Sequence, residues 1–231
     1  MTNGAAPEVG VWWATPVGPD PTSCGSAQKM LWALLDDVEQ ARHDRLRRPA
    51  DRARFLTAHA LARLVLGRTL GRHPAALELF AECHHCGGPH GKLQLADREL
   101  ELSLTHAGDR VGVAVATVPV GIDVEDLAVT RVDPALAAQV LSPADLARWT
   151  ELPPARQASA LLRVWTRGEA VVKALGVGLD VDPRDLPPDT ARVVDLDPGP
   201  GFIGSLAVLG TALPTVRQHD GAELLLRAAA A

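Results

Sequence analysis

The chain alternates short apolar runs with longer segments in which apolar residues recur at helical spacing. The run at residues 120–125 is apolar up to two carboxylates at its end, which is typical of a strand that is largely buried. Turn-forming residues separate the runs. On this basis we predict strands over residues 9–14, 77–81, 93–95, 100–104, 111–117 and 120–125, and late strands or a hairpin over residues 201–209 and 222–229.

Helical periodicity recurs in both parts of the chain. Gly71 stands where a helix C-terminal glycine is favoured, and Ser142 followed by Pro143 is a favourable helix start. Segments rich in Pro and Gly, or in Pro and Asp, predict the longer loops. The predicted helices cover residues 28–46, 50–70, 142–150 and 157–175, and the loops residues 15–26, 83–92 and 180–197.

The order of elements repeats along the chain. Each part has a short helix, a longer helix that ends in Leu-Gly, and then strands, although residue identity between the parts is poor. We therefore predict an α+β fold of two similar halves, residues 1–118 and 119–231, with the junction near Pro119. Such a junction forms a cleft, which is a favoured place for a ligand.

Composition narrows the classes of function. The chain has 231 residues, of which 47% are apolar, enough for one large domain or two smaller ones and too many for a disordered chain. A net charge of −5 argues against broad binding to nucleic acid or to anionic membranes. Three cysteines, no apolar segment at residues 1–10 and no run of about 18 apolar residues indicate a cytoplasmic protein without a disulfide framework, signal peptide or membrane span.

Two carboxylates end the apolar run Val-Gly-Ile-Asp-Val-Glu. Asp123 and Glu125 are two residues apart, so on a strand they point to the same face. Two carboxylates on one buried face repel each other, and a divalent cation would relieve this repulsion. The alternative is a strand end with both side chains in water.

A second acidic pattern lies in the last predicted helix. Glu169 and Lys173 are four residues apart and share a helix face. The alternative is an ordinary surface ion pair, but Trp165 on the same face indicates partial burial, where an unpaired Glu is costly. If helix and strand meet, three carboxylates and a lysine converge. Such a site suits Mg²⁺ and a phosphate-bearing substrate.

Basic side chains offer candidates for phosphate binding. His106 follows a predicted strand and precedes a glycine turn, where it is either structural or a phosphate ligand. An arginine cluster before the second helix is either a solvated face or an anchor for a ligand with several phosphates. The cluster consists of Arg47, Arg48, Arg52 and Arg54.

The loop Cys-His-His-Cys at residues 83–86, with His90 beyond it, resembles half of a zinc site. Structural zinc usually needs a second ligand pair at a defined spacing, which the chain does not show. A plain loop is the favoured interpretation, and zinc stays an alternative.

Taken together, these motifs resemble the 4′-phosphopantetheinyl transferases, of the Sfp-like class that modifies carrier proteins of secondary metabolism. The resemblance extends over residues 46–179. It rests on Arg54 in Asp-Arg-Ala-Arg-Phe-Leu, on Gly91-Lys92, on Ser-Leu-Thr-His at residues 103–106, and most on Gly-Ile-Asp-Val-Glu at residues 121–125 with Trp-x3-Glu-x3-Lys at residues 165–173. The last two, in this order and separation, are specific together.

The resemblance implies a pseudo-dimer that binds coenzyme A between its halves. It implies a holo-[acyl-carrier-protein] synthase type of reaction: the phosphopantetheine arm is transferred to a serine of an acyl or peptidyl carrier protein of polyketide or nonribosomal peptide synthesis, as in antibiotic biosynthesis, and 3′,5′-ADP is released. Because the two halves supply both walls of the cleft, we expect a monomer, and the net charge leads us to expect no binding to nucleic acid or membrane.

The resemblance also implies residue roles. Asp123, Glu125 and Glu169 would bind Mg²⁺. Glu169 would help to deprotonate the attacking serine and Lys173 would steady the leaving group. The remaining coenzyme A ligands would be Arg47, Arg54, Lys92, Thr105 and His106, together with Asp123 and Lys173.

One position departs from the family pattern. Gly168 stands where the family commonly has Lys, and a glycine inside a helix is unfavourable. This leaves open a non-catalytic relative that binds coenzyme A or a carrier protein. The residues alone also leave open another Mg²⁺-dependent phosphotransfer enzyme. A P-loop enzyme is disfavoured because its phosphate-binding motif is absent from the sequence.

Overall fold

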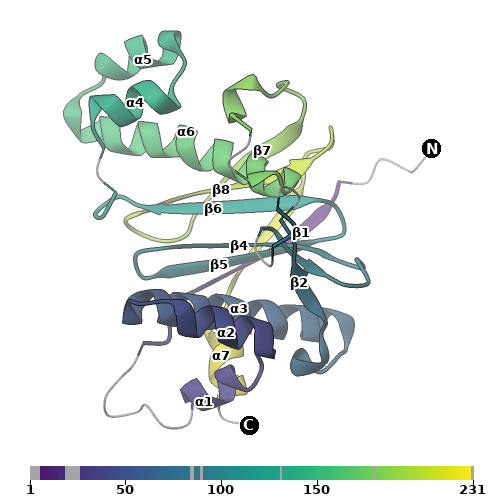
Figure 1. Cartoon of the computed structure of the whole chain (residues 1–231). Helices are drawn as coiled ribbons and strands as arrows, with labels where there is room; N and C mark the ends of the chain where they lie inside the picture. The colour runs from purple at the N-terminus through teal and green to yellow at the C-terminus, as the bar shows by residue number, and fades with distance from the viewer. Residues whose placement is uncertain are drawn as a thin grey trace.

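Two β-sheets, each covered by one long helix, make up the body of the molecule in the computed structural model (Figure 1). The structure describes residues 6–18, 27–83, 86–88, 91–130, 132–178 and 181–229. The first sheet has the strand order β4-β5-β1-β9, in which β1 pairs antiparallel with β5 and parallel with β9. Its strands are β1 (Glu8–Ala14), β4 (Glu101–Ala107), β5 (Arg110–Ala116) and β9 (Thr215–Asp220).

The second sheet is antiparallel, with the order β6-β8-β7. It consists of β6 (Val120–Asp126), β7 (Ala191–Leu196) and β8 (Phe202–Leu209), and a small separate pair is formed by β2 (Leu79–Ala81) and β3 (Leu93–Leu95).

The long helices α3 (Pro49–Leu70) and α6 (Pro154–Leu175) correspond to each other in the two halves. Both have 22 residues, begin at a proline and end at a glycine in the left-handed conformation, Gly71 and Gly176. The shorter helices are α1 (Ala27–Trp32), α2 (Asp37–Arg45), α4 (Pro134–Val140), α5 (Pro143–Thr150) and α7 (Ala222–Ala228), with 3₁₀ turns η1 (Pro74–Ala76) and η3 (Pro183–Asp185).

The molecule has four layers, in the order helix, sheet, sheet and helix (Figure 1), because successive side chains of a strand pack on opposite faces of its sheet. On β5, Val113 and Val115 belong to the apolar core with α3, whereas Ala114 and Ala116 belong to the core between the sheets. On β6, Ile122 and its alternate neighbours lie in the core between the sheets. The opposite face of β6, which carries Asp123, therefore turns toward α6.

Small residues let α6 approach β6 closely. A Cβ on Gly121 would lie 2.0 Å from the Ala170 carbonyl oxygen and 2.4 Å from the Ala174 nitrogen. These alanines pack with Ala207 of β8 in a small buried cluster. The strand that carries Asp123 and the helix that carries Glu169 are therefore in contact, as the predicted convergence of their side chains requires.

The predicted α+β fold of two similar halves is confirmed, with differences in single elements. The strand predicted over residues 222–229 is wrong, because α7 occupies 222–228 and buries Leu225 against the core that contains α3. The helix predicted over residues 28–46 is two helices, because Asp36 begins α2 with a reciprocal capping box to Glu39. The elements α4, β7 and β9 were not expected.

The division at residues 118 and 119 stays a prediction. The C-terminal strand β9 lies in the sheet of the first half, beside β1, and α7 packs in the core of that half.

Candidate functional site

The two halves meet along β4 and β6, where side-chain hydroxyls bridge the strands. Ser103 Oγ accepts a hydrogen bond from the Ile122 amide at 3.1 Å, and Thr105 Oγ1 accepts one from the Val124 amide at 3.0 Å. Both hydroxyl residues are buried. We call this contact the seam, defined by Ser103, Thr105, Ile122 and Val124; it holds Asp123 beside the first half.

Asp123 is the centre of the site. Its Oδ1 accepts a hydrogen bond from Lys173 Nζ at 2.6 Å and lies 3.3 Å from Thr105 Oγ1. Its Oδ2 is buried and has no hydrogen-bond partner among the described residues. Burial raises the pKa of Asp123, although the positive charge of Lys173 acts in the opposite direction. A buried carboxylate oxygen without a partner is costly and is suited to a cation.

Glu125 and Glu169 are half-buried beside Asp123. Burial, and to a lesser degree the charge of Asp123, raises the pKa of Glu125 although Thr130 donates a hydrogen bond to it at 2.9 Å. Burial and then the charge of Asp123 likewise raise the pKa of Glu169. The three carboxylates thus lie near enough to repel one another, which is the electrostatic condition that a divalent cation relieves.

The carboxylates line a cleft of about 760 Å³. Its walls come from both halves, with α3 and β4 on one side and β6 and α6 on the other. Among the described residues, no three His, Cys, Asp or Glu side chains are already arranged around a metal position. The residues still fit Mg²⁺ as a donor set of hard oxygens, because Asp123 Oδ2 is unshared and the other two carboxylates border the same space.

Some of the predicted phosphate ligands line the cleft and others lie outside it. Lys92 and His106 line the cleft, but Lys92 Nζ is paired with Glu101 at 2.8 Å. Arg54 donates to the Gly108 carbonyl at 2.9 Å and pairs with Asp51, outside the cleft lining.

Arg47 and His106 are both exposed, but they differ in their position relative to the cleft. Arg47 is exposed and does not line the cleft. His106 lies at the cleft rim, where partial loss of hydration and then the charges of Arg54 and Lys173 lower its pKa.

The cleft wall on α3 and α2 was not expected to contribute. Phe55 stacks on His59 with ring centroids 4.0 Å apart, and the Arg42 guanidinium lies 5.6 Å from the Phe55 ring. All three residues line the cleft. His59 Nδ1 is hydrogen-bonded to the buried Glu39 at 2.7 Å. Phe55 and His59 are four residues apart in the predicted helix, and this spacing does not distinguish a cleft wall from a core.

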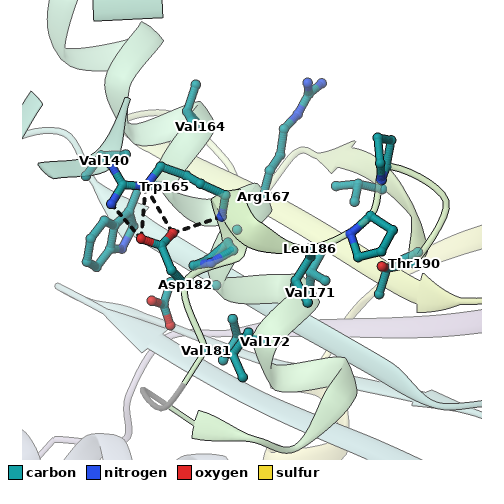
Figure 2. Close-up of a pocket in the computed structure, with 18 of the residues that line it drawn as sticks. Val140, Val164, Trp165, Arg167, Val171, Val172, Val181, Asp182, Leu186 and Thr190 are labelled. Atoms are coloured by element: carbon teal, nitrogen blue, oxygen red, sulfur yellow. Dashed lines mark hydrogen bonds and ion pairs between the residues drawn. The ribbon is translucent and has the colours of Figure 1, made fainter. Parts of the chain in front are cut away.

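A second cavity, of about 560 Å³, lies on another side of α6 (Figure 2). Its walls are mostly apolar, and they come from α4, α6, β7 and the segment at residues 181–190. Gly168 lines it, and a Cβ on Gly168 would lie 3.0 Å from Pro183 Cβ. The absence of a side chain at position 168 thus serves packing of η3 on α6.

The cysteine loop reaches the cleft as well. Cys83 and Cys86 both line it. His84, His85 and His90, together with Cys24, lie outside the described residues, so the zinc alternative stays open.

No helix in the described part of the chain combines the length and apolar character needed to cross a bilayer.

Comparison with known proteins gives one consistent result. Residues 119–217 match the model of the 4′-phosphopantetheinyl transferase superfamily. The chain is 28% identical over 197 residues to the 4′-phosphopantetheinyl transferase HetI of Nostoc sp.. The matched region covers 78% of the chain and 81% of that protein. It is 25% identical over 162 residues to a 4′-phosphopantetheinyl transferase of Bacillus subtilis, covering 70% and 68%.

A third relative, from Synechocystis sp. and named provisionally as a 4′-phosphopantetheinyl transferase, is 29% identical over 161 residues. This match covers 68% of the chain but 63% of the relative's length. The family resemblance predicted from the sequence is confirmed, while the matches do not single out the Sfp-like class.

Proposed function

We propose, from this similarity to the 4′-phosphopantetheinyl transferase superfamily, that the chain transfers the phosphopantetheine arm of coenzyme A to a serine of an apo acyl or peptidyl carrier protein. One observation carries the proposal: Asp123 on β6 and Lys173 on α6 are hydrogen-bonded at 2.6 Å in a cleft that Glu125 and Glu169 also line. The family similarity covers the segment that contains all four residues.

In the proposed reaction, the serine oxygen attacks the β-phosphorus of coenzyme A and the bond to 3′,5′-ADP breaks. Asp123, Glu125 and Glu169 would hold Mg²⁺, which when bound neutralises charge on the diphosphate. Lys173 is only partly exposed and presents its ammonium group to the same place, where it stabilises negative charge that develops on the leaving group.

Glu169 is the proposed base for the serine proton. Its pKa lies above the ordinary value because of burial and the neighbouring carboxylates, which makes it a better proton acceptor than an exposed glutamate. Its position on α6, one turn before Lys173, places the proton acceptor and the cation on one face of the helix.

The cleft wall supplies the proposed binding of the rest of coenzyme A. His106 and Lys92 line the cleft on the side of the first half and would contact the 3′-phosphoadenosine end. Arg47 and Arg54 keep this role only as an expectation from the family pattern. Carrier proteins of secondary metabolism as acceptors, a monomeric state and a cytoplasmic location complete the proposal.

The test is the intact mass of an apo carrier protein after incubation with the chain, coenzyme A and Mg²⁺. The expected result is a gain of one phosphopantetheine arm, lost with Asp123→Ala although that variant folds. No mass gain on any carrier, with coenzyme A still bound, would support the non-catalytic alternative. Transfer of phosphate without the arm would support a different phosphotransfer enzyme.

A further inference from the structure

The Thr105 hydroxyl is in contact with three polar neighbours inside the protein. A threonine hydroxyl has one hydrogen to donate and two lone pairs that accept. Thr105 Oγ1 accepts from the Val124 amide at 3.0 Å, lies 3.5 Å from Lys173 Nζ, and is 3.3 Å from Asp123 Oδ1. With both nitrogens as donors, the hydroxyl hydrogen is directed to the carboxylate.

Ser103 makes the same type of seam contact without the second one. Its Oγ accepts from the Ile122 amide at 3.1 Å, and it has no hydrogen bond to Asp123. The two residues stand on alternate positions of β4 and are both buried. Seam formation alone therefore explains Ser103, whereas Thr105 has an additional contact with a carboxylate of the proposed metal site.

We propose that Thr105 is a positioning residue that fixes the rotation of the Asp123 carboxylate. The hydrogen bond from Thr105 and the one from Lys173 both hold Oδ1, so the carboxylate cannot turn freely and Oδ2 stays unshared. This inference rests on the proposed function, because it takes Asp123 as a Mg²⁺ ligand. Groups that orient a metal ligand typically change metal affinity about 10–100-fold when they are removed.

The alternative role for Thr105 is direct contact with coenzyme A, as the family resemblance implies. The two roles predict different losses. A positioning residue changes the affinity for the cation, whereas a ligand for coenzyme A changes the KM of that substrate. A residue that serves only the seam changes the stability of the fold and neither of these.

The experiment compares Thr105→Val, Thr105→Ser and Ser103→Ala in the full chain. Valine keeps the shape and removes the hydroxyl, serine keeps the hydroxyl, and Ser103→Ala breaks the matched seam contact away from Asp123. Three quantities are measured for each: the Kd of Mn²⁺ from the free-ion signal in electron paramagnetic resonance, the KM of coenzyme A, and the Tm. Mn²⁺ is a suitable probe because it shares the preference of Mg²⁺ for oxygen ligands.

Thr105→Val is expected to raise the Mn²⁺ Kd by about 10-fold or more, and Thr105→Ser to restore it to within about twofold of wild type. Ser103→Ala is expected to lower the Tm as much as Thr105→Val does and to leave the Mn²⁺ Kd unchanged.

Three results would overturn the proposal. They are an unchanged Mn²⁺ Kd in Thr105→Val, an equal rise of this Kd in Ser103→Ala, and a rise in the KM of coenzyme A with no change in Mn²⁺ affinity. Failure of the proposed function is separate: a wild-type chain that binds Mn²⁺ but modifies no carrier would end the transferase proposal, and the Mn²⁺ comparison would still support the positioning role.

Discussion

The close contact between β6 and α6 leaves no room for a side chain at Gly121. In Gly121→Ala the new Cβ would lie 2.0 Å from the Ala170 carbonyl, whereas ordinary contact begins at 3.4 Å. Because the clashing atoms belong to the helix backbone, α6 must move away from β6 by about 1.4 Å. A shift of this size breaks the hydrogen bond of 2.6 Å between Lys173 and Asp123.

Two effects should follow. Overpacking of this kind costs about 3 kcal/mol, which for a chain of this size lowers the Tm by about 6–12 °C. Displacement of a catalytic group by about 1 Å lowers turnover on the order of 100-fold.

Thermal unfolding and the carrier-protein mass assay measure these effects. Gly18→Ala is the matched control, because nothing lies within 4 Å of its new Cβ. A Gly121→Ala variant that melts and turns over like the control would refute the close approach of α6 and the geometry built on it.

Three more predictions concern other parts of the chain. Glu39→Gln should cost about 1–3 kcal/mol in urea unfolding, because fully buried Arg63 loses one charged partner at 2.7 Å but keeps its ion pair with Asp36; no measurable cost would contradict this. Burial alone would raise the pKa of Glu39, but the hydrogen bond with His59 and the nearby positive charges outweigh burial and hold this pKa below 4.5. The destabilisation by Glu39→Gln should therefore be complete above about pH 4.5 and should shrink as the pH falls through the lowered pKa. His106→Ala should raise the KM of coenzyme A more than that of dephospho-coenzyme A in steady-state kinetics, whereas equal increases would place the 3′-phosphate elsewhere. Gly168→Ala should lower the Tm rather than raise it, because its Cβ would lie 3.0 Å from Pro183, and a higher Tm would show that helix propensity outweighs this contact.

Local patterns were enough to predict much of the fold. The long helices and the strands through Glu125 were found from periodicity and from helix-end residues, and both depend on neighbours in sequence. The late elements were harder: α7 was predicted as a strand because a short apolar run is compatible with either structure. β9 is exposed along most of its length and so carries almost no apolar signal.

The candidate site, like the fold, could be predicted only in part from the sequence. The carboxylates could be placed on shared faces from spacing alone, and the glycine at 121 and the alanines of α6 then allow strand and helix to meet. The contacts of Arg54, Lys92 and Thr105 could not be predicted, because Gly108, Glu101 and Asp123, which they contact, lie 9 to 54 residues away in sequence. From helix propensity alone Gly168 is unfavourable, and the sequence does not show that Pro183 packs against this position.

The distribution of charge across the cleft connects the fold to the proposed chemistry. The wall from the second half is acidic, with Asp123, Glu125 and Glu169, while the wall from the first half presents His106 and the Arg42 side chain. A ligand that carries phosphates and brings a divalent cation contacts both walls, so it links two halves that otherwise meet through their apolar sheet faces and the seam. Coenzyme A with Mg²⁺ should therefore stabilise the whole chain, and coenzyme A without the cation should do so far less, because the acidic wall then repels its phosphates.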